Sequence, residues 1–174
     1  FSNEAGLGSS PIAHAAAKTN NPIKQGTISM LEPLIDTLVV CTITAFVILI
    51  SDSWISGVNG ASLTTLAFSQ GIPVIGKYIV IVGLILFAFS TIIGWSYYGE
   101  KCAEFLFGNN VITIYRILWI IIIPIGATTE LNLVWLVADI MNGLMALPNL
   151  IALILLSPVV FTVTKKYLND KNDI

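Results

Sequence analysis

Long runs of apolar residues are the main feature of the chain. Four of them, residues 28–50, 77–99, 111–128 and 147–165, approach or reach the length of about 17–25 residues that an α-helix needs to cross a bilayer. The polar residues gather mostly between these runs. The pattern predicts an all-α membrane protein with four spans and membrane lipid as their surroundings.

Composition supports the same class. Apolar residues make up 56% of the chain, charged residues only 10%, and the mean hydropathy is +0.88. A soluble domain usually carries about a quarter of charged residues, so this chain lacks the polar surface that a water-exposed globule needs. The net charge is −2, and the chain has no basic patch outside the loops between helices, so no nucleic acid is expected as a partner. No enzyme motif occurs and no cofactor is expected.

The first 17 residues are polar and rich in glycine before they turn apolar. Gly6, Gly8 and Pro11 precede a run of alanines, which indicates an unwound stretch that leads into a short helix, the second half of a broken helix. Unwound backbone at membrane depth survives only where protein buries it or where it lines a watery cavity. In transporters such breaks meet substrate and ions. The alternative is a polar loop at the end of a span. Because the first residue is Phe1 and not Met, we expect an N-terminally truncated fragment.

The remaining boundaries follow from local signals. Ser29–Glu32 has the spacing of a capping box and predicts a helix start near residue 28. Residues 51–76 are rich in Gly, Ser and Thr and predict a long structured extracellular loop with room for small helices. Residues 131–145 predict a short helix, separated from the last span by a break at Leu147–Asn149.

The positive charges decide how often the last apolar region crosses the membrane. If residues 131–166 cross once, seven of the eight positive residues face the cytoplasm and only Lys77 borders the outer loop. Two crossings would place Lys165, Lys166 and Lys171 outside. The positive-inside rule therefore favours one crossing. The cytoplasmic positive residues are then Lys18, Lys24, Lys101, Arg116, Lys165, Lys166 and Lys171.

Hydroxyl groups on the second full span are candidate ligands for a cation. Phe87, Ser90 and Thr91 have the spacing i, i+3 and i+4, so they share one face of a helix. A backbone carbonyl and two hydroxyls there suit Na⁺, a hard cation. The alternative is that both hydroxyls bond back to carbonyls one turn earlier. Trp95 lies one turn beyond Thr91 on the same helix face. Most membrane tryptophans are anchors at the membrane interface, and Trp95 could be one of them.

Two carboxylates lie near or within the membrane, where such groups are usually functional or paired. Glu4 follows the unwound stretch, and its expected part is to hold the break in shape. Asp36 could pair with a lysine such as Lys24 or line the inner exit path. His14, the only histidine, has no partner at a catalytic spacing.

The opening motif, FSNEAGLGSSP over Phe1–Pro11, closely resembles the signature of the sodium:alanine (or glycine) symporter family. Three further stretches resemble that family in the same order along the chain. They are Glu32–Thr42, Phe89–Trp95 and Ala138–Gly143.

This resemblance implies a fold and a partner. The family belongs to the amino acid–polyamine–organocation superfamily, whose leucine-transporter-type fold has two inverted five-helix repeats (5+5). The chain would be the second five-helix repeat, and the first repeat would be its partner.

The resemblance also implies a function and a set of site residues. The function is sodium-coupled symport of a small neutral amino acid, alanine or glycine, across the plasma membrane (the bacterial inner membrane), with Na⁺ as the coupling ion. Phe87, Ser90 and Thr91 would bind Na⁺, and Glu4, Gly6 and Asp36 would act in structure or coupling. The implied substrate-binding residues are Phe1, Ser2, Asn3, Thr91 and Trp95.

Two other hypotheses remain open at this point. One is proton coupling, with Glu4 or Asp36 as the proton carrier. The other is that the chain is a non-transporting membrane remnant.

Overall fold

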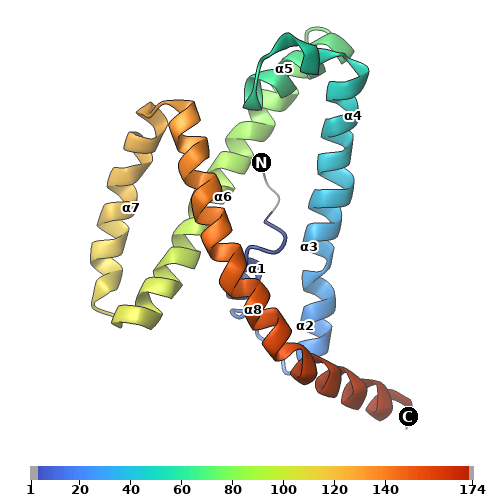
Figure 1. Ribbon diagram of the computed structural model, residues 1–174, viewed down its shortest axis with the longest axis vertical. Helices are drawn as coiled ribbons and strands as arrows, with labels where there is room; N and C mark the ends of the chain where they lie inside the picture. Colours follow the sequence, from blue (N-terminus) through green and yellow to red (C-terminus); the bar gives the residue numbers. More distant parts are fainter. Residues whose placement is uncertain (1–3, 173–174) are drawn as a thin grey trace. The chain divides into compact units, whose positions relative to one another are not determined.

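The computed structural model describes residues 4–172, and side chains over residues 4–169. All regular structure in this range is helical, which confirms the all-α class (Figure 1). The helices are α1 (Ser10–His14), α2 (Pro22–Ser29), α3 (Leu31–Pro33), the π-helix η1 (Leu34–Cys41), α4 (Thr42–Ile50), the 3-10 helix η2 (Ser53–Ser56), α5 (Gly60–Gly71), α6 (Gly76–Phe107), α7 (Val111–Thr128) and α8 (Leu131–Asn172).

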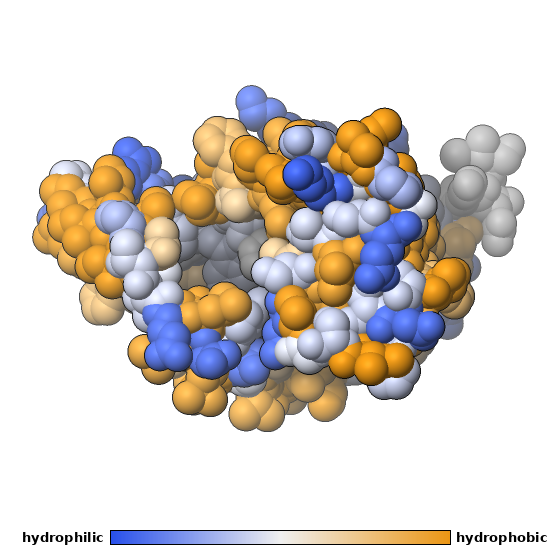
Figure 2. All heavy atoms as spheres, turned by 90° about the horizontal axis from the view of Figure 1, so that it is seen from above, coloured by the Kyte–Doolittle hydropathy of each residue, from blue (hydrophilic) through white to orange (hydrophobic). Residues whose placement is uncertain are grey.

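Within the described residues, four helical stretches are long and apolar enough to cross a membrane. They are Pro22–Ile50, Gly76–Phe107, Val111–Thr128 and Leu131–Asn169. No residue of their most apolar windows is buried inside the described structure. Figure 2 shows apolar side chains over much of the visible face. Exposed apolar surface of this extent is typical of helices that face lipid or further protein, so the membrane class is confirmed.

The first of these stretches begins earlier than residue 28. The Asn21 side chain accepts a hydrogen bond from the backbone N–H of Lys24 at 3.0 Å, and Pro22 occupies the first helical position. Both are strong signals for a helix start. The Ser29 hydroxyl instead donates to the Gly26 carbonyl at 2.8 Å. The capping box expected at Ser29–Glu32 is therefore wrong, because those residues lie inside the helical stretch.

The helical register changes immediately after Pro33. This residue has no N–H to offer the α-helical ladder, and Leu34–Cys41 form a π-helix that carries Asp36. The hydroxyl oxygen of Thr37 in this segment is buried and has no hydrogen-bond partner within the described structure. Thr44, further along the same span, bonds back to the Val40 carbonyl at 2.9 Å. Segments of π-helix occur frequently at functional sites.

The region between the first two spans contains the small helices η2 and α5, and α5 packs against α4. Ser53 is 2% exposed and links the two sides of this turn. Its hydroxyl lies 2.8 Å from that of Ser51 and donates to the Gln70 side chain at 3.1 Å. Ala67 of α5 is fully buried. The structured loop expected at residues 51–76 therefore contains two short helices, for which the sequence left room.

Helix α8 runs without a break from Leu131 to Asn172, although it contains Pro148 and Pro158. Proline leaves the carbonyl four residues earlier without its helical donor. For Pro158 that carbonyl belongs to Ile154, and the Ser157 hydroxyl donates to it at 2.8 Å. Neighbouring hydroxyls are one of the ways in which membrane helices tolerate proline. The break expected at Leu147–Asn149 is therefore wrong, and the expected helices 131–145 and 147–165 are one helix.

The described residues divide into two compact units, and α6 contributes to both. One unit comprises Leu31–Trp95, and the other comprises Glu4–Met30 together with the chain from Ser96 onward. In the first unit, α6 begins at Gly76 in very close contact with α5. A Cβ at Gly76 would lie 2.0 Å from the carbonyl oxygen of Phe68. Only glycine fits at this position without a backbone shift.

We predict that Gly76→Ala destabilises the protein. The added methyl collides with backbone, and overpacking of this kind costs about 1–3 kcal/mol. Thermal unfolding in detergent should therefore occur at a lower temperature. Gly83→Ala is the matched control, because it lies in the same helix with open space around it. Equal unfolding midpoints for the two variants would contradict the close contact.

Candidate functional site

The segment from Glu4 to Ser9 is non-helical and forms a compact turn ahead of α1. Gly6 and Gly8 have φ angles of +84° and +90°, a region that L-residues with side chains rarely adopt. Ser9 is fully buried, and its hydroxyl donates to a carboxylate oxygen of Glu4 at 2.5 Å. The described part of the opening motif is thus unwound and internally bonded. Phe1, Ser2 and Asn3, the expected substrate-binding residues, lie outside the described residues.

This unwound segment contacts α8 through Asn149. The Asn149 amide nitrogen donates to the Gly6 carbonyl at 3.0 Å. A Cβ at Gly8 would lie 3.0 Å from the Asn149 side-chain carbon Cγ. The sequence analysis assigned Asn149 to a helix break and missed this contact. An amide within an apolar span is the signal that could have found it, because such side chains bond across helices.

The expected sodium ligands Phe87, Ser90 and Thr91 lie on α6 in the first unit. The Ser90 hydroxyl donates to the Phe87 carbonyl at 3.0 Å. This is the back-bonding that the sequence analysis left open as the alternative. Phe87 and Ser90 are exposed, whereas Thr91 and Trp95 are partly buried. The carbonyl and hydroxyl oxygens of one α6 turn therefore lie together, and their role as ligands stays a prediction.

A bidentate ion pair joins α6 to α7 in the second unit. The Arg116 guanidinium donates to both carboxylate oxygens of Glu100, at 2.6 and 2.9 Å. The Glu100 side chain is only 14% exposed. Next to it, a Cβ at Gly99 would meet the Tyr115 hydroxyl. Bidentate pairs add geometric specificity to their energy, so this contact fixes how the two helices meet. Sequence reasoning missed it.

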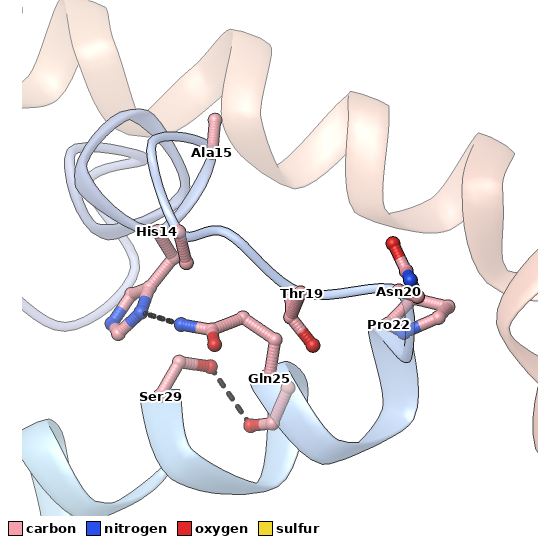
Figure 3. A pocket seen from close by; sticks show the side chains of 9 residues that line it. His14, Ala15, Thr19, Asn20, Pro22, Gln25 and Ser29 are labelled. Carbon is pink, nitrogen blue, oxygen red and sulfur yellow. Dashed lines mark hydrogen bonds between the residues drawn. The ribbon is translucent and has the colours of Figure 1, made fainter.

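A hollow of about 340 Å³ lies between α1 and α2 (Figure 3). Its walls include His14 and Gln25, whose side-chain nitrogens lie 2.7 Å apart. None of the described residues expected to bind substrate or Na⁺ lines it. His14 therefore has an amide neighbour here, and this hollow adds no residue to the expected site.

Comparison with known proteins identifies the family. The sequence profile described as the sodium:alanine symporter family matches residues 1–173. The chain belongs to the sodium:alanine symporter family. The resemblance inferred from the opening motif is thereby confirmed. This family consists of transporters and not of enzymes, as the sequence predicted.

Individual members of the sodium:alanine symporter family are similar along nearly the whole chain. The sodium/alanine symporter AgcS of Methanococcus maripaludis is 52% identical over 171 residues, and an uncharacterized transporter of Haemophilus influenzae is 51% identical over 169. The probable sodium/glutamine symporter GlnT of Bacillus subtilis is 44% identical over 173 residues. These alignments cover 96–98% of this chain but only 36–38% of the relatives. The chain therefore spans a little over a third of their length.

We predict that Ser9→Ala loosens the unwound segment. It removes the donor to Glu4, and hydrogen bonds to charged groups contribute about 1.5–3 kcal/mol. The thermal unfolding midpoint should therefore fall. It should fall less for the control Ser29→Ala, because the Ser29 hydroxyl donates to the Gly26 carbonyl of its own helix, which is not a tertiary contact. A double-mutant cycle with Glu4→Ala should show strong non-additivity. Additive effects would mean that the two side chains do not interact.

Proposed function

We propose that this chain is part of a sodium-coupled symporter that takes up a small neutral amino acid, alanine or glycine, across the plasma membrane. The observation that carries the proposal is the unwound segment Glu4–Ser9, with positive φ angles at Gly6 and Gly8, in a chain that is mostly helical and apolar. Irregular backbone is costly in a membrane unless it is used. Membership of the sodium:alanine symporter family, and relatives named for sodium with alanine or glutamine, support the same function.

The proposed architecture is the second five-helix repeat of a leucine-transporter-type 5+5 fold. Its partner is the first repeat, which carries the other broken helix. The exposed apolar side chains of the four candidate spans suit such a partner as well as lipid. In this arrangement the substrate site lies where the broken helices meet, near the bilayer midplane.

The substrate site proposed on this chain joins the opening motif to α6. Backbone N–H groups near Phe1, Ser2 and Asn3 face the substrate carboxylate, because a half-helix N-terminus favours negative charge. Phe1 and Trp95 bound the substrate side chain, and Thr91 lies on the same α6 face. A bulky indole limits the site to small amino acids.

The proposed sodium site uses the Phe87 carbonyl and the hydroxyls of Ser90 and Thr91. The Ser90 hydroxyl donates to the Phe87 carbonyl, so these two oxygens lie within hydrogen-bond distance of each other. For Na⁺ to bind, the Ser90 O–H would rotate its proton away from the Phe87 carbonyl, so that both oxygens direct lone pairs at the cation. Transport is coupled because Na⁺ and substrate share the break, and each then raises the affinity for the other by the same factor.

Uptake measurements on the whole protein test the function. Alanine, glycine and serine should compete for uptake, and replacing Na⁺ with choline should abolish it. Uptake that continues in choline and rises as the external pH falls would favour proton coupling through Glu4 or Asp36. A protein that takes up none of these amino acids under either condition would contradict the proposal.

We predict that Thr91→Ala mainly weakens sodium dependence. Loss of one oxygen ligand should raise the Na⁺ concentration for half-maximal uptake about tenfold, which corresponds to about 1.4 kcal/mol. Thr91→Ser keeps the hydroxyl and should stay near the wild-type value. An unchanged sodium dependence in Thr91→Ala would remove Thr91 from the site.

We predict that Trp95→Ala mainly broadens the substrate range. Removing the indole should let leucine-sized amino acids compete, with a shift of about tenfold in their KM relative to that of alanine. Trp95→Phe should give an intermediate range. The check is a competition series of amino acids of increasing size. A variant that keeps the wild-type selectivity would place Trp95 away from the pocket.

A further inference from the structure

The unwound segment Glu4–Ser9 is tied to α8 by a side chain outside every stretch of the family motif. Asn149 follows Gly6 by 143 residues, yet its amide nitrogen donates to the Gly6 carbonyl at 3.0 Å. Gly6, Gly8 and Asn149 belong to the same compact unit. The contact therefore joins the unwound segment to α8, the fourth candidate span described in this chain.

The two glycines contribute to this contact in different ways. Gly6 presents its carbonyl to the amide, in a segment where no helical ladder serves it. Gly8 leaves room for the amide, because a Cβ there would lie 3.0 Å from Asn149 Cγ and 3.0 Å from its Oδ1. The Asn149 side chain thus donates a hydrogen bond to Gly6 and fills the space beside Gly8. Each contact restricts the position of Asn149 and of the segment together.

Placement of an amide in this part of α8 is costly without a partner. Asn149 lies in a helix whose neighbouring residues, Leu147–Ile154, are otherwise apolar or small. Asn149 is partly exposed within the described structure, and an amide that faces apolar surroundings without a hydrogen bond costs about 1–3 kcal/mol. The Gly6 carbonyl accepts a hydrogen bond from the Asn149 amide. That carbonyl lies in unwound backbone and therefore also needs a hydrogen-bond partner. The contact satisfies both groups at once.

We infer that Asn149 is a positioning residue for substrate binding. It holds Gly6 and Gly8 in the turn at Glu4–Ser9, although Asn149 itself belongs to no expected ligand set. This inference rests on the proposed function, in which the opening motif meets the substrate carboxylate.

Kinetics of uptake test the inference on the whole protein. Asn149→Ala removes the donor and should raise the KM for alanine about threefold to tenfold, the range of one neutral hydrogen bond, with little change in Vmax. Asn149→Asp should be worse, because it places a carboxylate oxygen against the Gly6 carbonyl. A wild-type KM in both variants would overturn the inference. If Asn149→Ala does not accumulate in the membrane, Asn149→Ser gives the same test, because its hydroxyl is too short to reach Gly6.

The glycines provide a matched pair that separates positioning from general disruption. Alanine at Gly6 or Gly8 imposes the same positive-φ strain, but only Gly8→Ala also collides with Asn149. Asn149→Ala should therefore relieve part of the KM defect of Gly8→Ala and none of the defect of Gly6→Ala. Equal behaviour of the two glycine variants in the Asn149→Ala background would contradict the contact.

Hydrogen–deuterium exchange separates this inference from the proposed function. Amides of residues 4–9 should exchange faster in Asn149→Ala than in wild type, whatever the transported substrate is. Unchanged exchange would overturn the inference even if alanine uptake is sodium-coupled. Faster exchange in a protein that takes up no small neutral amino acid would support the contact while the proposed function fails.

Discussion

The constraint on which this structure depends is that every backbone N–H and C=O inside a membrane needs a partner within the protein. Continuous helices meet it over the four apolar stretches. Where the helical hydrogen bonds are interrupted, a nearby side chain must supply the missing donor. The Ser157 hydroxyl serves the Ile154 carbonyl beside Pro158, and the Asn149 amide serves the Gly6 carbonyl in the unwound segment. The Ser157 and Asn149 side chains are informative because each supplies a donor to a backbone carbonyl without a helical partner.

The same constraint explains why the opening motif is both irregular and compact. Gly6 and Gly8 allow turns that other residues adopt at a cost, and the buried Ser9 hydroxyl bonds the Glu4 carboxylate. A segment held in this way keeps its backbone groups in defined directions without a helix. Preorganised backbone of this kind can bind a carboxylate or a cation with little loss of entropy. The π-helix around Asp36, with the buried hydroxyl of Thr37, is a second departure from regular geometry.

Much of the fold could be predicted from apolar runs, because a span needs length and hydropathy and little else. The bounds of α7 match the sequence prediction, whereas the first span begins at Pro22 because Asn21 and Pro22 outweigh the capping box at Ser29–Glu32. Pro148 does not end α8, because a proline that ends helices in water can be accommodated within a membrane helix. For the site, the opening motif predicted an unwound stretch, and residues 4–9 are non-helical, whereas the ligand roles of its residues stay predictions.

The sequence by itself determined the class, the family and the four apolar spans, since these follow from composition and from motifs that are continuous along the chain. Only the tertiary structure decided that Asn149 meets Gly6 and Gly8, and that Arg116 pairs with Glu100. Such contacts join positions far apart in the chain and depend on how helices pack. The local spacing of residues does not determine which residue of another segment an amide or a guanidinium will contact.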